Sequence, residues 1–215
     1  MCIFVLVMLS TVTFDGFVET PLWTDFLDWL SENQTLRPLL LWLQESGVDL
    51  LKGTKTVALL VLPLFFVASY YAFCAAASKM AGGSISTSRL ANTLVLTLVP
   101  IAIAYHFAHY LSYLLLAGQL IIPLASDPFG WGWDLFGTAS RAIDIGIIDA
   151  ATVWYVALFA IVGGHAIAVW LAHVIALTLY PDSTSALMSQ IPILVLMVLY
   201  TMTSLWILSQ PIVQT

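Results

Sequence analysis

Charged side chains are scarce in this sequence of 215 residues: they make up 8% of it, against roughly a quarter in an ordinary soluble domain. Basic residues are the scarcest, with 6 Lys and Arg against 12 Asp and Glu. Without a basic patch to neutralise phosphates, nucleic-acid binding is excluded. Two cysteines, Cys2 and Cys74, are too few for a disulfide framework or a zinc knuckle. Since 61% of the residues are hydrophobic, the composition indicates an integral membrane protein rather than a soluble enzyme.

Four stretches without any charged residue are each long enough to cross a bilayer, which takes roughly 20 helical residues. They comprise the 23 residues between Lys55 and Lys79, the 37 between Arg89 and Asp127, the 32 between Asp149 and Asp182, and the 33 after Asp182. A helix is the one single-segment structure that satisfies its own backbone in lipid. We therefore expect an all-α bundle with spanning helices near 55–78, 90–123, 150–179 and 186–209, and kinks at Pro63, Pro100 and Pro192.

The N-terminal region, residues 1–53, has a different character from the bundle at 54–215. Met1 to Phe14 is apolar but too short to span, so we expect a cut-short helix or a re-entrant segment. Seven of the twelve acidic residues follow within residues 15–53. Thr24 at the start of one amphipathic helix and Pro38 before a second predict two helices lying in the membrane interface. Their anchors would be Trp23, Trp29 and Trp42.

All four histidines fall in the two central predicted spans, where ionisable groups are costly and are functional candidates by default. They are His106, His109, His165 and His173. His109 lies 15 residues before Leu124 and His165 lies 15 residues after Ala150, so both are about 22 Å from the connecting loop. His106, His109 and His165 could therefore meet at one depth, with His173 about 12 Å further along.

Three converging histidines predict a metal or cofactor site, in which zinc, copper or iron are all possible ions. With an open fourth position they suit a hydrolytic zinc ion, and two of them on facing helices suit axial ligation of haem. The alternative is that each histidine only hydrogen-bonds a carbonyl or tyrosine of a neighbouring helix. Neither the HxxH spacing nor any nucleophile motif specifies a reaction.

The loop from Ser126 to Ala150 joins the two histidine-bearing spans. Its tryptophans and phenylalanines suit an interfacial aromatic belt or a lid, and its carboxylates Asp127 and Asp134 lie about 20 Å from the histidines. Asp149 is expected to cap the following helix. We expect this loop on the outer face, and the loop between Lys79 and Arg89, which contains no acidic residue, in the cytoplasm.

Several stretches resemble a family of bacterial polytopic membrane proteins called fenitrothion hydrolase. They are VTFDGFVETPLW (12–23), AYHFAHYLSYLLLAGQ (104–119), SDPFGWGWDLFGTA (126–139), TVWYVALFAIVGGHAIAVWLAH (152–173) and SQIPILVLMVLYTMTSLWILSQP (189–211). The likeness covers most of this chain, which is similar to the C-terminal half of those longer proteins. The family's histidine blocks correspond to His106, His109, His165 and His173, whereas Val174 and Ile175 stand where relatives carry a histidine–aspartate pair.

The resemblance implies a multi-pass protein of the bacterial inner membrane and metal-assisted hydrolysis of a lipophilic, organophosphate-type ester. The competing expectation is a non-catalytic or redox subunit of a larger membrane complex, associated with haem or pigment. Under either expectation the partners are membrane lipid and other membrane subunits, held by small and hydroxyl residues on helix faces.

Overall fold

The structure is a computed structural model, and it describes residues 1–210. Within that range every regular element is a helix, which confirms the all-α expectation. Four helical segments are long and apolar enough to cross a membrane. They are α4 (Leu50–Met80), the broken helix Thr87–Ser126, α8 (Ala150–Leu179) and α9 (Ser183–Ser209). The chain is accordingly a multi-pass membrane protein.

The second span is interrupted twice by short 3₁₀ segments. In order it consists of α5 (Thr87–Leu94), η1 (Val95–Leu98), α6 (Val99–Leu116), η2 (Ala117–Leu120) and α7 (Ile121–Ser126). Pro100 lies in the first turn of α6, directly after the first interruption, where a proline needs no backbone donor. Pro63 and Pro192, by contrast, lie inside the continuous helices α4 and α9.

The N-terminal segment is part of the bundle. Helix α1 (Cys2–Phe17) buries Val5, Leu6 and Leu9 in the same apolar core as residues of α4 and α9. It meets α2 (Pro21–Glu32) at an angle of 79°, and α3 (Arg37–Glu45) then leads to α4. The expected helix start at Thr24 is wrong: α2 begins at Pro21, since a proline is well suited to a first helical position.

One of the three expected tryptophan anchors has another role. Trp23 is buried, with 2% of its surface exposed, and its ring packs edge-on against Phe14 and Phe17. It thereby holds the bend between α1 and α2. Trp29 and Trp42 are exposed, as an interfacial anchor requires.

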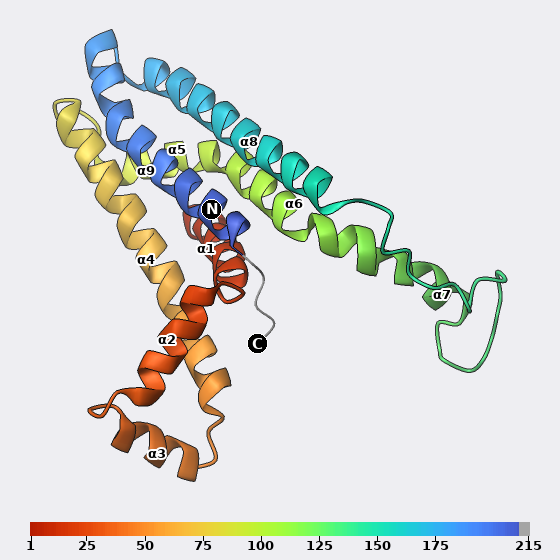
Figure 1. Cartoon of the computed structure of the whole chain (residues 1–215). Helices are drawn as coiled ribbons and strands as arrows, with labels where there is room; N and C mark the ends of the chain where they lie inside the picture. The colour runs from red at the N-terminus through yellow and green to blue at the C-terminus, as the bar shows by residue number, and fades with distance from the viewer. Residues whose placement is uncertain (211–215) are drawn as a thin grey trace.

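The helices form two wings that diverge from their common packed region (Figure 1). Helices α6 and α8 lie side by side in one wing, α1 and α4 belong to the other, and α9 packs against both α8 and α4. The closest approach is at Gly164 of α8, where a Cβ atom would lie 2.5 Å from Cβ of Ala104 and 2.9 Å from the carbonyl oxygen of Pro100. A glycine here lets the two backbones touch, as small residues do in membrane bundles.

Beyond α6, the chain forms an arm, which we define as η2, α7 and residues 127–149; it extends away from α1 and α9 (Figure 1). Carboxylates organise its turns: Asp127 accepts from the backbone amides of Trp131 and Gly132, at 2.9 and 2.8 Å. The rings of Phe129, Trp131 and Trp133 pack on one another at the exposed tip. As expected, Asp149 caps α8, accepting from the amide of Thr152 at 2.9 Å.

Candidate functional site

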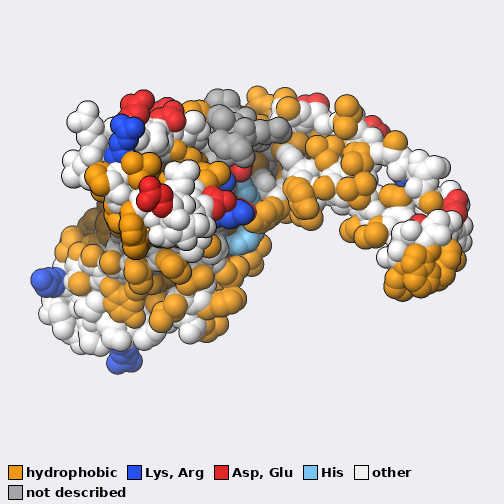
Figure 2. All heavy atoms as spheres, turned by 90° about the horizontal axis from the view of Figure 1, so that it is seen from below, with side chains coloured by type: hydrophobic (Ala, Val, Ile, Leu, Met, Phe, Trp, Pro, Cys, Tyr) orange, Lys and Arg blue, Asp and Glu red, His pale blue; other side chains and the backbone are white. Residues whose placement is uncertain are grey.

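An ionisable pair lies where the two wings diverge. Asp15 comes from the last turn of α1 and His109 from the middle of α6, with His109 Nε2 3.7 Å from Asp15 Oδ2. The hydroxyl of Tyr110 donates to the same carboxylate oxygen at 2.5 Å. The side chains of His109 and Asp15 are 22% and 51% exposed, so the pair is accessible from outside the bundle. Histidine side chains are visible between the body and the arm in Figure 2.

His106 lies one turn before His109 but makes a different contact. Its Nδ1 is 2.8 Å from the carbonyl oxygen of Ala102 on the same helix. A carbonyl can only accept, so Nδ1 carries the proton and Nε2 keeps a free lone pair. The His106 ring lies beside that of Tyr110, with centroids 6.3 Å apart.

His165 is the buried histidine, with 7% of its surface exposed in the middle of α8. Its Nδ1 lies 2.8 Å from the carbonyl oxygen of Ile161, so the same reasoning leaves Nε2 as the unprotonated nitrogen. That Nε2 is buried and has no hydrogen-bond partner among residues 1–210. The nearest aromatic ring is that of Tyr200 in α9, with centroids 6.1 Å apart.

His173 lies two turns further along α8 and binds a neighbouring helix. Its Nδ1 is 2.8 Å from Oε1 of Gln190 in α9. The amide nitrogen of Gln190 donates to the Ala186 carbonyl at 2.8 Å, which orients the oxygen toward the histidine. His165, His173 and Gln190 line a shallow groove of about 690 Å³ between α8 and α9.

The expected convergence of His106, His109 and His165 on one point is not seen. Within the described chain, no three His, Cys, Asp or Glu side chains are grouped so that they could hold one metal ion. The expectation that His109 and His165 lie at the same depth is also wrong. Gly164, which precedes His165, packs against Pro100 and Ala104, and both of these lie more than a turn before His109. The equal depths assumed that Leu124 and Ala150 are level, whereas this contact places the start of α8 beside the end of α6, with η2 and α7 extending beyond it; His109 therefore lies about 10 Å nearer the loop side than His165.

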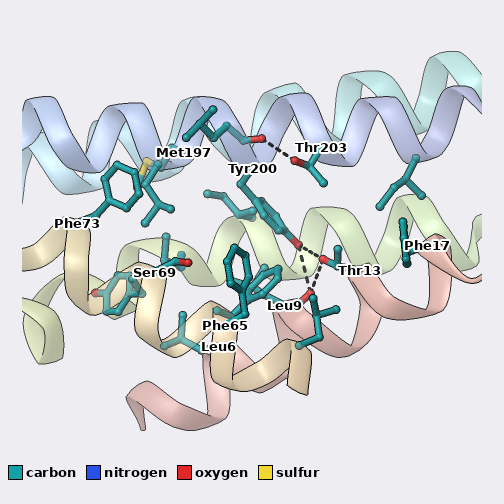
Figure 3. Close-up of a pocket in the computed structure, with 18 of the residues that line it drawn as sticks. Leu6, Leu9, Thr13, Phe17, Phe65, Ser69, Phe73, Met197, Tyr200 and Thr203 are labelled. Carbon is teal, nitrogen blue, oxygen red and sulfur yellow. Dashed lines mark hydrogen bonds between the residues drawn. The ribbon is translucent and has the colours of Figure 1, made fainter. Parts of the chain in front are cut away.

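The second candidate is an apolar cavity of about 440 Å³ enclosed by α1, α4 and α9 (Figure 3). Its walls are mainly aliphatic and aromatic, and the hydroxyl-bearing residues of its lining are Thr13, Ser69, Tyr70, Tyr200 and Thr203. The Tyr200 hydroxyl lies 3.0 Å from Thr13 Oγ1, which itself donates to the Leu9 carbonyl at 2.7 Å. Because Thr13 gives its proton to Leu9, Tyr200 is the donor between the two hydroxyls.

The cavity opens toward the outside of the bundle between α4 and α9. Two of its lining residues, Phe65 and Leu199, are 63% and 49% exposed. Both belong to candidate spans, so this opening faces the hydrocarbon of the bilayer rather than water. The cavity and the Asp15–His109 pair lie on opposite faces of α1, since Thr13 and Phe17 line the cavity and Asp15 does not.

The loop carboxylates form local contacts within the arm. Asp134 accepts from the Ser126 hydroxyl at 2.7 Å and from the Ala139 amide at 3.0 Å. The Ser126 hydrogen bond, followed by that of Ala139, holds the pKa of Asp134 below its ordinary value. Both bonds order the loop, and neither Asp127 nor Asp134 contributes to the histidine contacts.

Two features of these sites were missed from the sequence. Asp15 was grouped with the interfacial acids, although it follows an apolar run and belongs to the resemblance block 12–23. The cavity draws its hydroxyls from three helices far apart in the chain, and spacing along one helix does not reveal such a set. No family model, curated protein or solved structure matches the chain.

Proposed function

We propose that this chain is a multi-pass protein of the bacterial inner membrane that takes a lipophilic molecule from the bilayer into the cavity between α1, α4 and α9. The observation that carries the proposal is the cavity itself, which has an apolar lining and an opening between two spans. Its volume of about 440 Å³ falls within the roughly 300–1,000 Å³ typical of small-molecule sites.

The lining favours a long apolar molecule with one hydrogen-bonding group. Most of the wall offers only dispersion contacts, which an acyl or isoprenoid chain provides along its length. The Ser69 hydroxyl at the α4 wall and the oxygen of Tyr200 provide the polar contacts (Figure 3). A bilayer-soluble ester has this chemistry, and so do a lipid and an isoprenoid alcohol.

A photoreactive fatty acid carrying a diazirine in its chain tests the proposal in proteoliposomes. We expect saturable labelling of α4 and α9 peptides that line the cavity, suppressed by excess oleate. Ser69→Phe places a ring in the cavity and should abolish the saturable part. Ala68→Phe is the matched control, because Ala68 is exposed on the same turn and does not line the cavity.

Labelling of the cavity peptides that excess oleate does not suppress would contradict the proposal. So would equal labelling of the Ser69→Phe and Ala68→Phe proteins. Phe159 in α8 is 74% exposed and lies outside the cavity, so its peptide reports the unsaturable labelling expected of any lipid-facing surface.

The second candidate function is metal binding at the Asp15–His109 pair, with metal-assisted hydrolysis of a lipophilic ester as its chemistry. The separation of 3.7 Å favours it, because two zinc ligands at 2.0–2.1 Å and a tetrahedral angle lie about 3.4 Å apart. The free Nε2 of His106 lies one turn away on the same helix. These residues are two or three ligands at most, so a further ligand would have to come from substrate, water or another subunit.

Equilibrium dialysis of the purified protein against zinc distinguishes this candidate from the first. We expect His109→Ala to lose bound zinc and His173→Ala, remote from Asp15, to keep it. Equal zinc in the two variants removes the metal hypothesis, and it leaves the cavity proposal untouched because neither residue lines that cavity.

A further inference from the structure

The polar groups that line the α1–α4–α9 cavity differ in whether they have a hydrogen left to donate. Thr13 donates to the Leu9 carbonyl oxygen at 2.7 Å, and the Tyr200 hydroxyl lies 3.0 Å from Thr13 Oγ1 and 3.4 Å from the same carbonyl oxygen (Figure 3). Whichever of these oxygens Tyr200 donates to, both hydroxyl hydrogens are used among Thr13, Tyr200 and Leu9. The pair therefore offers only oxygen lone pairs to a molecule in the cavity.

Two other hydroxyls of the lining are committed in the same way. Tyr70 donates to the Ala91 carbonyl at 2.7 Å, and Thr203 donates to the Leu199 carbonyl at 3.0 Å. A hydroxyl has one hydrogen and two lone pairs, so each of these groups also remains an acceptor. Four of the five lining hydroxyls thus favour a molecule that donates a hydrogen bond.

Ser69 of α4 faces Tyr200 of α9 across the cavity and provides the complementary group (Figure 3). The hydrogen of a serine hydroxyl rotates to suit its partner, so Ser69 can donate to an oxygen of the bound molecule. The indole of Trp206, 38% exposed at the edge of the cavity, can do the same. An alcohol satisfies both walls, because it accepts from Ser69 while it donates to Tyr200 or Thr13. An ether or ester oxygen accepts from Ser69 but leaves the lone pairs on the facing wall unused.

The lining also restricts the charge of the bound molecule. Among the described residues that line the cavity there is no Asp, Glu, Lys, Arg or His. Ser69 lies about 16 Å from the nearer end of α4, so this polar part of the cavity lies inside the span rather than at the level of the lipid head groups. An ionised group there would lose its hydration without gaining a partner, which is costly. A phosphate or choline head group is therefore disfavoured.

We propose that the cavity binds an uncharged lipid alcohol, with a long aliphatic or isoprenoid chain, and discriminates against ethers, esters and charged lipids. The inference rests on the proposed function, since it specifies the molecule that this same cavity takes from the bilayer. The hydroxyl of the alcohol lies between Ser69 and the Tyr200–Thr13 pair, and its chain fills the apolar remainder. A fatty acid enters in its protonated form, which donates a hydrogen bond as an alcohol does.

Competition against the photoreactive fatty acid in proteoliposomes tests the inference, with oleyl alcohol, oleyl methyl ether and oleyl phosphate as competitors. The three share one chain and differ only at the polar end, and their concentrations are expressed as mole fractions in the bilayer. We expect the alcohol to suppress the saturable labelling at about one-fifth of the mole fraction that the ether requires, the ratio for one net hydrogen bond of about 1 kcal/mol. Oleyl phosphate should compete less well than the alcohol.

Variants assign the preference to named oxygens. Tyr200→Phe combined with Thr13→Val keeps the shape of both side chains and removes their oxygens, so the alcohol and the ether should then compete almost equally. Tyr105→Phe is the matched control. The Tyr105 ring packs edge-on against that of Tyr200, with centroids 6.0 Å apart, but Tyr105 does not line the cavity, so the preference of the intact protein should remain.

The inference is overturned if the ether or the phosphate competes as well as the alcohol with the intact protein, or if the double variant keeps the preference for the alcohol. In these cases saturable labelling by the fatty acid still supports the proposed function. If no labelling is saturable, the proposed function fails, and the inference fails with it.

Discussion

Gly163 and Gly164 offer a sharp test of how α6 and α8 pack. A Cβ atom on Gly164 would lie 2.5 Å from Cβ of Ala104 and 2.9 Å from the Pro100 carbonyl oxygen, whereas one on Gly163 would meet nothing within 4 Å. Carbon atoms pack at about 3.5–4.0 Å, so Gly164→Ala must push the helices apart by about 1 Å. Neither neighbour can rotate away, since one is a short side chain and the other is backbone.

Gly163→Ala and Gly164→Ala share one contribution to the free energy of unfolding and differ in a second. Both gain about 1 kcal/mol of helix propensity, because glycine is the poorer helix former. Gly164→Ala alone incurs the overpacking cost of about 1–3 kcal/mol. We therefore expect Gly163→Ala to be more stable than Gly164→Ala by about 1–3 kcal/mol.

The assay is SDS-induced unfolding in mild detergent micelles, followed by circular dichroism, which yields the free energy of unfolding for each variant. Equal free energies of unfolding for the two variants would refute the close contact at Gly164. The same result would remove the basis for placing His165 level with Tyr105, because that register depends on the Gly164 contact.

Two further predictions concern other parts of the bundle. Tyr70→Phe should lower the free energy of unfolding by about 1 kcal/mol, because it breaks the hydrogen bond from α4 to α5, and Tyr71→Phe should change it less; SDS unfolding measures both. The pKa of Asp134 is lowered by its hydrogen bonds, so its contribution to loop order is complete above pH 4 or so and is lost as the pH falls through the lowered pKa. A spin label at Leu135→Cys should therefore gain mobility below about pH 4. The additional change Asp134→Asn should make it mobile at every pH, and a label that stays immobile in acid would contradict this account.

The histidines show which features of a site the sequence alone can predict. Their cost in lipid marks them as functional candidates, and helix geometry places them to within a turn or so. Spacing along the chain does not determine how each helix is rotated about its own axis, because that rotation depends on which small residues contact each other between helices. Gly164 against Ala104 and Gly16 against Ile207 set those rotations, and they direct His109 to Asp15 and His165 to Tyr200.

The sequence by itself determines that this is a helical membrane protein with four charge-free candidate spans, because the need to satisfy every backbone group in lipid leaves a helix as the only structure for each run. It also determines the capping of α8 by Asp149, which is a contact between neighbours in the chain. Only the tertiary structure decides that α1 joins the core, that a cavity opens between α4 and α9, and that the ring of Tyr105 in α6 packs edge-on against that of Tyr200 in α9. The physical reason is that these features depend on the relative rotation and depth of helices, which contacts between residues distant in the chain establish.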